Sequence, residues 1–249
     1  MATSRIIDYS VTFNREARAE EAVTALKLSG HDLKKGALLD IGCGTGSTTR
    51  WFAANLGVYS VGVEVLNLFK SPANALNPRL GFAFASGLAL PFRAKSFHTV
   101  VLNDVLEHVS YRDADRLFSQ ISSVLDEDGM LYVSVANKYQ VMEPHSGLLF
   151  ISWLPRWIYL PMVRRFFHDE VYPYTVDKFR ALSDRAGFSC ENYTWLYVAK
   201  KMRDVNYIGN TMVRPMAKAL IRLGLAKSPG FLRFLERFAV LLFVCRKHK

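Results

Sequence analysis

The sequence predicts an α/β protein built on a doubly wound, mostly parallel sheet, and three features of the chain carry that prediction. Short apolar runs recur along the first 137 residues. Segments with helical spacing of apolar side chains separate these runs. The runs are apolar almost throughout, which is typical of parallel strands that helices cover on both faces.

The first elements follow from local composition. Residues 16–28 mix alanines with charged side chains, and Gly30 follows where a helix C-cap is expected. The segment "GALLDIG", residues 36–42, is a short apolar run of the buried-strand type, and it precedes a predicted helix over residues 47–55. Residues 58–65, "VYSVGVEV", form a second predicted strand of the same type.

The later elements repeat the pattern. Residues 97–104 and 130–137 are apolar runs, and the turn sequence Asp-Glu-Asp-Gly at residues 126–129 announces the second of them. Residues 113–125 lie between these strands and carry apolar side chains at helical spacing. Two late apolar segments are expected to pair antiparallel at the sheet edge, residues 190–200 and 237–247.

Composition limits the class of protein. Half of the 249 residues are hydrophobic and 22% are charged, so the chain can bury a core. The N-terminal residues have no apolar core of the signal-peptide kind. The apolar run Phe238–Cys245 is far shorter than the roughly 20 residues that a membrane span needs. We therefore expect a cytoplasmic protein that is soluble or peripheral at the membrane.

The cysteines are few and dispersed. Cys43, Cys190 and Cys245 lie far apart, with no CxxC pattern and no Cys/His spacing. This spacing argues against a disulfide framework and against a structural zinc site, and it fits a reducing compartment. We expect no metal.

Charge divides the chain unevenly. The first 150 residues hold 14 Lys and Arg against 15 Asp and Glu, whereas the remaining 99 hold 18 against 7, so the whole net charge of +10 comes from the C-terminal part. No Gly/Ser-rich or Pro-rich linker separates the two parts. We expect one domain over residues 1–249, with three regions: a cofactor-binding core (1–140), an apolar lid (141–175) and a basic amphipathic insertion between the last two strands (201–236).

A glycine-rich bend follows the first predicted strand. In "DIGCGTGS", Asp40 stands at the strand end, where a carboxylate would repel a phosphate, and Ser47 breaks the GxGxxG pattern of dinucleotide sites. Glu64 ends the next strand, where an acidic side chain can accept hydrogen bonds from both ribose hydroxyls. No P-loop pattern is present. These features suit a ligand with a positive centre and an adenosine but no pyrophosphate, a description that fits S-adenosylmethionine.

Four motifs in order resemble the class I S-adenosylmethionine-dependent methyltransferases, with a methyltransferase type 11-like pattern. They cover roughly residues 35–137 and comprise "DIGCGTG" from Asp40, the second-strand acid Glu64, the stretch Leu88–Val109, and the fifth-strand segment "LDEDGMLYVSVAN". The resemblance implies a Rossmann-like, mostly parallel seven-stranded sheet with a C-terminal antiparallel edge hairpin. It also implies S-adenosylmethionine as cofactor and methyl transfer as activity.

The resemblance assigns cofactor contacts residue by residue. The residues implied are Asp40, Gly42, Cys43, Gly44, Thr45 and Gly46 for the methionine moiety, Glu64 with Val65 for the ribose, Ser86, Gly87 and Leu88 for the adenine, and Asn103 and Asp104 beside the sulfonium. Two positions depart from the family pattern. Ser86 and His98 stand where Asp is common. Ser86 is a weaker, uncharged acceptor for the adenine amino group, and His98 is expected to be structural.

The acceptor is less constrained. A Pro-Pro motif, typical of amine methylation in nucleic acids, is absent after the fourth predicted strand, and no Pro-Cys nucleophile is present. The dispersed cysteines also disfavour arsenic methylation. His108, His145 and Glu143 are candidate catalytic residues; the alternative for His108 is that it braces the following helix. Glu107 and His108 alone offer too few ligands for a metal site.

The C-terminal part combines aromatic and basic residues. Residues 147–174 and 210–238 interleave Trp, Tyr, Phe, Leu and Met with Arg and Lys. Three interpretations stay open: an anionic membrane surface, a cap packed on the sheet with a solvated basic rim, or nucleic acid. We expect O-methylation of an apolar, lipid-linked or glycan acceptor. The alternatives are an RNA methyltransferase or a non-catalytic binding protein on this fold, and the oligomeric state is open.

Overall fold

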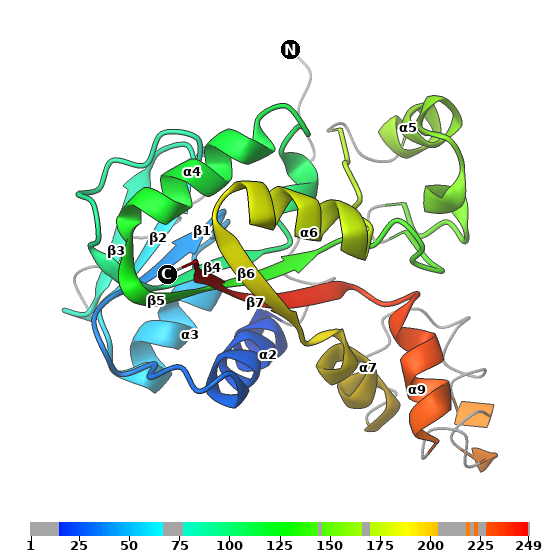
Figure 1. Ribbon diagram of the computed structural model, residues 1–249, viewed down its shortest axis with the longest axis horizontal. Coiled ribbons are helices and arrows are strands. Elements are labelled where there is room, and N and C mark those ends of the chain that lie inside the picture. The colour runs from blue at the N-terminus through cyan, green and yellow to red at the C-terminus, as the bar shows by residue number, and fades with distance from the viewer. Residues whose placement is uncertain are drawn as a thin grey trace.

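The computed structural model describes residues 15–66, 77–143, 146–165, 170–203, 218–219, 222–223 and 228–248. These residues form one seven-stranded sheet with helices on both faces, and the strand order is β3-β2-β1-β4-β5-β7-β6 (Figure 1). The predicted fold class, a mostly parallel α/β sheet with an antiparallel edge, is confirmed.

Five strands run parallel and the last two pair antiparallel at one edge. The strands are β1 (Leu38–Ile41), β2 (Ser60–Glu64), β3 (Leu80–Phe84), β4 (Phe97–Asn103), β5 (Leu125–Val135), β6 (Phe188–Asn192) and β7 (Leu241–Lys247). Strand β7 is antiparallel to both β5 and β6. The carboxyl ends of β1 to β5 therefore meet at the same edge of the sheet, where ligands bind in open α/β folds.

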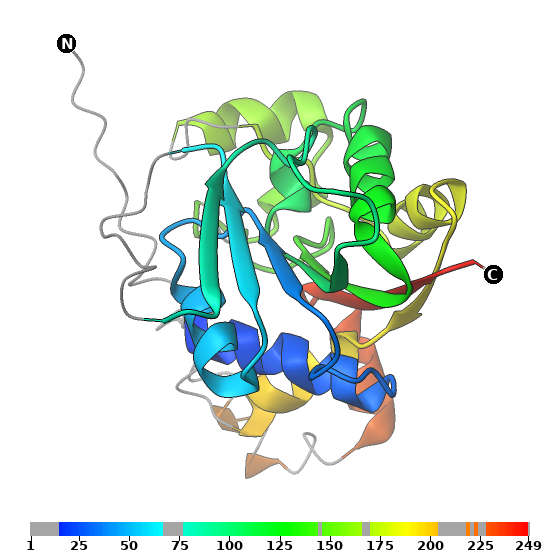
Figure 2. The same ribbon diagram turned by 90° about the vertical axis from the view of Figure 1, so that its left-hand side faces the viewer.

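Helices cover the sheet on two sides, as Figure 2 shows with α2 and α3 on one side and α4 on the other. The helices are α2 (Arg15–Leu28), α3 (Ser47–Leu56), α4 (Ala114–Val124), α5 (Arg156–Arg164), α6 (Val176–Arg185), α7 (Thr194–Arg203) and α9 (Pro229–Glu236), with short 3-10 turns η2 (Leu106–His108) and η3 (Ile151–Trp153). Within the described ranges, no helix is both long enough and apolar enough to cross a lipid bilayer.

Two buried clusters hold these layers together. On one face, α4 and α6 pack on the sheet, and the rings of Phe179 and Phe243 stack with centroids 4.0 Å apart. On the other face, α2, α3 and α7 pack around Phe52 and Tyr132, both with no exposed side-chain surface. Close packing on both faces makes the sheet a rigid platform for the loops at its carboxyl edge.

Most predicted elements of the first 137 residues lie within a few residues of their observed positions. Strand β5 begins at Leu125 instead of Met130, because residues 126–129 form an irregularity within the strand where the pairing shifts between Phe97 and Thr99 of β4. Strand β3 and helix α6 were not predicted from local pattern. The sequence of β3, "LGFAF", is short and contains a glycine, which weakens the strand signal.

The prediction of a strand over residues 190–200 is wrong beyond Asn192. Residues from Thr194 onward form helix α7, and the Asn192 side chain accepts a hydrogen bond from the Thr194 N–H at 2.8 Å at its start. Leu196 and Tyr197 of this helix pack against the cluster around α2. A short apolar run does not separate strand from helix, so tertiary packing decided this segment. Strand β7 likewise begins at Leu241, after α9, instead of at residue 237.

The expectation of no disulfide is also wrong. Cys190 and Cys245 are directly opposed in the register of β6 and β7 and form a disulfide across 55 residues of sequence. Spacing along the chain could not reveal this pair, because strand pairing brings the two residues together. Cys43 is a free, buried thiol.

Two of the predicted features lie wholly or largely outside the described residues. They are His145 and most of the basic insertion, of which the structure describes residues 201–203, 218–219, 222–223 and 228–236. The boundaries proposed for the lid and the insertion stay predictions.

Candidate functional site

The glycine-rich bend connects β1 to α3 at the carboxyl edge of the sheet. Gly42, Gly44 and Gly46 all have positive φ angles, of 70°, 56° and 79°. A Cβ on Gly42 would lie 2.3 Å from the Val105 side chain, and one on Gly46 would lie 2.5 Å from the Phe82 ring. These two positions need glycine for packing. A Cβ on Gly44 would meet only the Arg15 guanidinium, at 3.7 Å, so this part of the bend is open to a ligand.

The acid at the end of β2 faces this open position. Glu64 Oε2 accepts a hydrogen bond from the Gly44 N–H at 2.9 Å, and its Oε1 accepts one from the Val65 N–H at 2.8 Å. Strands β1 and β2 are neighbours in parallel register, which brings their carboxyl ends together. The structure therefore brings together the two parts of the site that sequence spacing had linked. The Thr45 carbonyl accepts from Arg50 at the same bend.

Asp40 is the most buried charged group of the site. Its carboxyl is 1% exposed and accepts a hydrogen bond from the Thr49 hydroxyl at 2.7 Å. Burial raises the pKa of Asp40 to about 7, while Thr49 and Arg15 act in the opposite direction. A cation placed beside this carboxyl would favour its ionised form.

The Cys43 thiol also lies in the bend. It is buried, and burial together with Asp40 and Glu64 raises its pKa well above the usual range. Since the thiolate is the reactive form of cysteine, this group acts here as a small apolar side chain.

The segment after β4 forms the opposite side of the site. Asp104 has a positive φ of 52°, and its N–H donates to the Ser134 hydroxyl at 3.0 Å. That hydroxyl also lies 3.0 Å from Asn103 Oδ1 and 2.7 Å from Asp104 Oδ1. The Asp104 carboxylate pairs with Arg18 of α2 at 3.0 Å. Arg18 in turn lies 3.1 Å from Glu21, so α2 holds the end of β4 in place.

Residues 86–88 lie at the carboxyl end of β3. A Cβ on Gly87 would lie 3.0 Å from Leu117 of α4 and 3.1 Å from Ile41 of β1, so the segment packs closely beside the first strand. The Ser86 hydroxyl accepts a hydrogen bond from the Leu88 N–H at 3.1 Å. The Ser86 hydroxyl is thus already engaged in a local turn, although an oxygen of this kind has a second lone pair.

Sequence reasoning missed three residues of this edge: Arg15, Arg18 and Ser134. The Arg15 Nε and the Asn103 Nδ2 are buried and have no hydrogen-bond partner among the described residues. A cationic group for Asp40, hydroxyls for Glu64 and an anion for Arg15 would satisfy the polar groups of this edge. The residues present therefore fit S-adenosylmethionine, which carries all three.

Comparisons with known proteins agree with this geometry. Residues 39–133 match the family model described as a methyltransferase domain. The chain carries a class I methyltransferase domain. The matched segment contains the glycine-rich bend, Glu64, residues 86–88 and the end of β4. The predicted family, with S-adenosylmethionine as its cofactor, is confirmed.

Solved structures share the fold of this methyltransferase at low sequence identity. A S-adenosylmethionine-dependent methyltransferase from Mesorhizobium loti has a TM-score of 0.59 at 17% identity, over 91% of this chain and 98% of that one. The 1,6-didemethyltoxoflavin-N1-methyltransferase of Burkholderia thailandensis, solved with S-adenosylhomocysteine, has a TM-score of 0.57 at 16% identity, over 94% and 80%. The geranyl diphosphate C-methyltransferase of Streptomyces coelicolor A3(2) has a TM-score of 0.56 at 15% identity, over 93% and 78%.

None of the curated proteins compared matches this sequence. The structural neighbours methylate different acceptors, on nitrogen in one case and on carbon in another, so the shared fold leaves the acceptor open.

Two of the three candidate catalytic residues, His108 and Glu143, lie in η2 and in the segment that follows β5. His108 is exposed in η2, whereas Glu143 is 2% exposed and its Oε2 accepts a hydrogen bond from the Ser146 N–H at 2.6 Å. The lid segment packs on η2 and β5 through backbone hydrogen bonds from Tyr172 to Glu107 (2.7 Å) and from Tyr174 to Ala136 (2.9 Å). His145 lies outside the described residues. No group of three or more His, Cys, Asp or Glu side chains in the described part could hold a metal ion.

A group of tyrosines lines this region. This tyrosine cluster consists of Tyr111, Tyr159, Tyr172 and Tyr174. The ring of Tyr111 lies 5.1 Å from that of Tyr172 and 5.4 Å from that of Tyr174. Burial raises the pKa of Tyr111 to about 12, and burial with Glu143 raises that of Tyr159 further. The hydroxyls of Tyr159 and Tyr174 are buried without a hydrogen-bond partner among the described residues.

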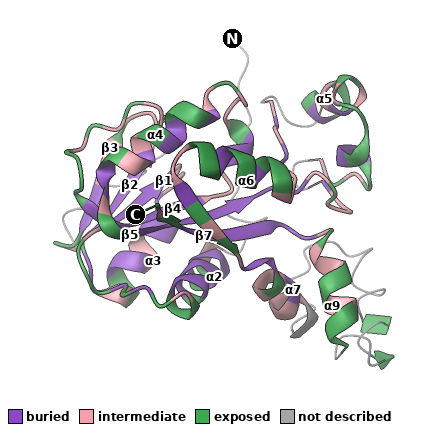
Figure 3. Ribbon diagram, in the orientation of Figure 1, coloured by how far each residue is buried: buried purple, intermediate pink, exposed green. Residues whose placement is uncertain are grey.

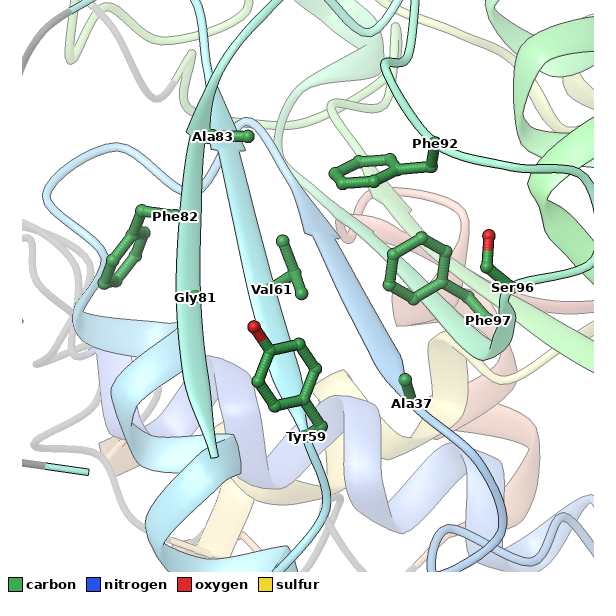
Figure 4. A pocket seen from close by; sticks show the side chains of 9 residues that line it. All are labelled: Ala37, Tyr59, Val61, Gly81, Phe82, Ala83, Phe92, Ser96 and Phe97. Atoms are coloured by element: carbon green, nitrogen blue, oxygen red, sulfur yellow. The ribbon is translucent and has the colours of Figure 1, made fainter. Parts of the chain in front are cut away.

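Two other features lie away from this site. His98, which departs from the family pattern, is buried in β4, lies 2.9 Å from Asp126 and stacks on His31, so its role is structural as expected. A hollow of about 370 Å³ lies over β2 and β3, where Tyr59, Phe92 and Phe97 line it (Figure 4). Ala37, Tyr59 and Phe97 stand at the amino ends of their strands, so this hollow is not the cofactor site.

Proposed function

We propose that this chain transfers the methyl group of S-adenosylmethionine to a hydroxyl oxygen of an apolar, lipid-linked or glycan acceptor. The observation that supports this most is the tyrosine cluster beside buried Glu143. Two of its phenols, Tyr159 and Tyr174, are buried and provide an apolar environment with hydroxyl groups that have no hydrogen-bond partner among the described residues. Such a lining suits a hydroxylated acceptor with an apolar body better than a charged nucleic acid.

The contacts proposed for the cofactor involve the glycine-rich bend and the acids beside it. Glu64 would accept hydrogen bonds from the ribose hydroxyls, because its carboxylate already lies at the open Gly44. Asp40 would stabilise the positive amino or sulfonium group, and Arg15 would pair with the carboxylate of the methionine moiety. Gly42, Cys43, Thr45 and Gly46 would contribute the shape of the bend, and Val65 would flank the ribose.

The adenine and the sulfonium would contact the neighbouring strand ends. Ser86, Gly87 and Leu88 would border the adenine from the end of β3. Asn103 and Asp104 would close the site beside the sulfonium, since the Ser134 hydroxyl and Arg18 hold them in position.

Methyl transfer requires the acceptor oxygen in line with the sulfonium, an alignment that contributes up to about 7–11 kcal/mol in ideal cases. A hydroxyl acceptor also benefits from a base that removes its proton. Glu143 is our first choice, since its carboxyl is buried at the lid beside Tyr159, whereas His108 is exposed. His145 stays a candidate on sequence grounds.

The experiment is incubation of the chain and methyl-labelled cofactor with a cell extract fractionated into lipid, glycan, small-molecule and RNA pools. We expect the label in the lipid, glycan or apolar small-molecule fraction, and we expect Glu143→Gln to lower incorporation while cofactor affinity stays unchanged. Label in RNA would favour the RNA methyltransferase instead. Cofactor binding with no labelled product in any fraction would favour a non-catalytic binding protein on this fold.

A further inference from the structure

A chain of aromatic rings crosses the surface at the carboxyl edge of the sheet. Trp153 of η3 lies at its centre: its ring stacks on that of Phe238 with centroids 5.7 Å apart, and the rings of Phe150 and Tyr139 contact it edge to face at 5.2 and 6.3 Å. Phe234 of α9 continues the chain and lies 5.2 Å from Phe238. Segments 80 residues apart in the sequence therefore form one aromatic surface.

These rings are exposed to an unusual extent. Four of the five, Tyr139, Phe150, Trp153 and Phe234, have between 41% and 51% of their surface accessible. Trp157, one turn further into α5, is 76% exposed. Scattered single apolar residues are normal on a protein surface, but contiguous exposed aromatic residues mark an interaction site.

Helix α9 contributes nothing to the core. It has no buried residue, although it is capped by the Ser228 side chain and carries Phe231, Leu232 and Phe234 among its eight residues. Figure 3 shows it, like α5, exposed or half-buried over most of its length. A well-capped helix with an apolar side and no buried residue is typical of helices that lie in a membrane interface.

Cations surround the rings. Arg233 and Arg237 are exposed on and just after α9, and Arg165 is exposed after α5. The Lys138 ammonium lies beside η3, where it donates hydrogen bonds to the carbonyls of Ser152 and Leu154. Residues 151–249 carry 18 basic against 7 acidic side chains. Trp153, Phe234 and Phe238 thus belong to the part of the sequence that carries the positive net charge.

We propose that this aromatic–basic face, made of the five rings with Lys138, Arg233 and Arg237, docks the protein on the surface of an anionic lipid bilayer. The rings would enter the headgroup boundary, and the cations would pair with lipid phosphates. Helices α5 and α9 both lie on the side of the sheet to which the carboxyl end of β5 points (Figure 1). A bilayer there would present acceptors directly to the methyltransferase site.

Two other partners fit less well. Single-stranded RNA would use the cations, but the rings here contact one another, whereas base stacking needs free ring faces. A second copy of the chain would bring two strongly positive faces together, which like charges oppose.

The test is flotation of the full chain with vesicles of equal parts phosphatidylcholine and phosphatidylglycerol at low salt. We expect binding that weakens as salt rises and that is absent on pure phosphatidylcholine, because the attraction is partly electrostatic. The double variant Arg233→Glu, Arg237→Glu should weaken vesicle binding by about 30-fold or more, since each cation near an anionic surface contributes about 1 kcal/mol. The control Arg79→Glu, Arg93→Glu makes the same charge change at the amino end of the strands and should change binding much less.

The contribution of the aromatic rings to vesicle binding is tested with a control residue of similar exposure. Phe234→Ser, at a ring that is 51% exposed, should weaken vesicle binding by about tenfold, whereas Tyr59→Ser, at 49% exposed, should leave it unchanged. Circular dichroism and cofactor binding verify that each variant is folded.

Three results would overturn the proposal: no flotation of the wild-type chain with anionic vesicles at low salt, equal losses in the face variants and their controls, or RNA binding or dimerisation that is lost in the face variants while vesicles are not bound. The readout does not depend on the proposed methyl acceptor. A chain that binds vesicles but methylates no lipid, glycan or apolar acceptor would contradict the proposed function and leave the docking face standing.

Discussion

Two parts of the carboxyl edge of the sheet are built in different ways. At the cofactor edge, formed by the ends of β1, β2 and β3, the two acids are held by the bend and by the helix that follows it: the Gly44 N–H donates to Glu64, and the Thr49 hydroxyl of α3 donates to Asp40. At the edge that we propose for the acceptor, beyond β4 and β5 and called the acceptor edge below, the lid and α9 meet through exposed aromatic rings.

The two edges differ in the buried clusters that stabilise them. The cofactor edge shares the main buried clusters of the sheet, whereas Ile151, Tyr159, Val163 and Val171 of the lid form a separate small cluster. Substitutions at the cofactor edge should therefore alter both the stability of the fold and the affinity for the cofactor. Substitutions at the acceptor edge should alter binding of the acceptor or of the membrane and leave the fold intact. The predictions below test this contrast, from the largest expected effect to the smallest.

Substitutions at two of the three glycines of the bend should have different effects on folding and on cofactor binding. Gly42→Ala places a Cβ against Val105 at a positive φ, so we expect a loss of about 3 kcal/mol in the free energy of unfolding. Gly44→Ala places a Cβ in ordinary contact with the Arg15 guanidinium, without a clash, and should lose only about 1 kcal/mol from the φ preference, while cofactor affinity falls. Urea unfolding and calorimetry measure both; equal destabilisation by the two variants would contradict this reading of the bend.

Glu64, at the end of β2, should contribute to the affinity for the cofactor and little to the stability of the fold. Glu64→Ala removes a charged acceptor for the ribose hydroxyls, so we expect cofactor affinity to fall by about 2 kcal/mol, or roughly 30-fold. Calorimetric titration measures it, with Glu20→Ala on the exposed side of α2 as the control. An unchanged affinity would remove Glu64 from the site.

Cofactor binding should depend on pH through Asp40. Its pKa is raised to about 7 in the ligand-free protein, and a bound cation would favour the ionised form. Binding should then release a proton below pH 7, and the affinity should fall as pH drops through 7, by at most about 1.4 kcal/mol per pH unit. Calorimetry in buffers of different ionisation enthalpy detects the proton, and Asp40→Asn should abolish the release.

The raised pKa of Asp40 also makes the free energy of unfolding depend on pH, in the opposite direction to the cofactor affinity. Since the folded-state pKa of Asp40 lies above its usual value, its contribution to the free energy of unfolding is present at low pH and is lost as pH rises through about 7. His31 acts in the other direction: burial and His98 lower its pKa to about 4, so its contribution is present above pH 6.5 and is lost as pH falls through 4. Unfolding of His31→Gln across this range isolates the second effect.

The smallest expected effect lies at the acceptor edge. Trp157→Ala removes a ring that is 76% exposed, so the free energy of unfolding should change by less than about 0.5 kcal/mol and cofactor affinity should not change. A destabilisation comparable to that of Gly42→Ala would show that the lid belongs to the main fold and would remove the contrast between the two edges.

Local sequence determined the cofactor half of the protein. Alternation of apolar runs with helical segments predicted β1, β2, β4 and β5 along the chain. Asp40, the glycines and Glu64 lie together as their spacing implied, because each belongs to a strand end or to the loop that directly follows it. Parallel neighbours carry such residues to one edge of the sheet whatever the rest of the chain does.

Only the tertiary structure decided what depends on distant segments. Arg15 and Arg18 reach the site from a helix that precedes the motifs, Cys190 meets Cys245 through strand pairing, and Thr194–Arg203 is a helix because its apolar side packs on α2. The aromatic–basic face likewise exists only because Trp153 and Phe238 stack across 85 residues of sequence. Short-range patterns fix strand ends and turns, whereas contacts between remote segments depend on packing that no local window contains.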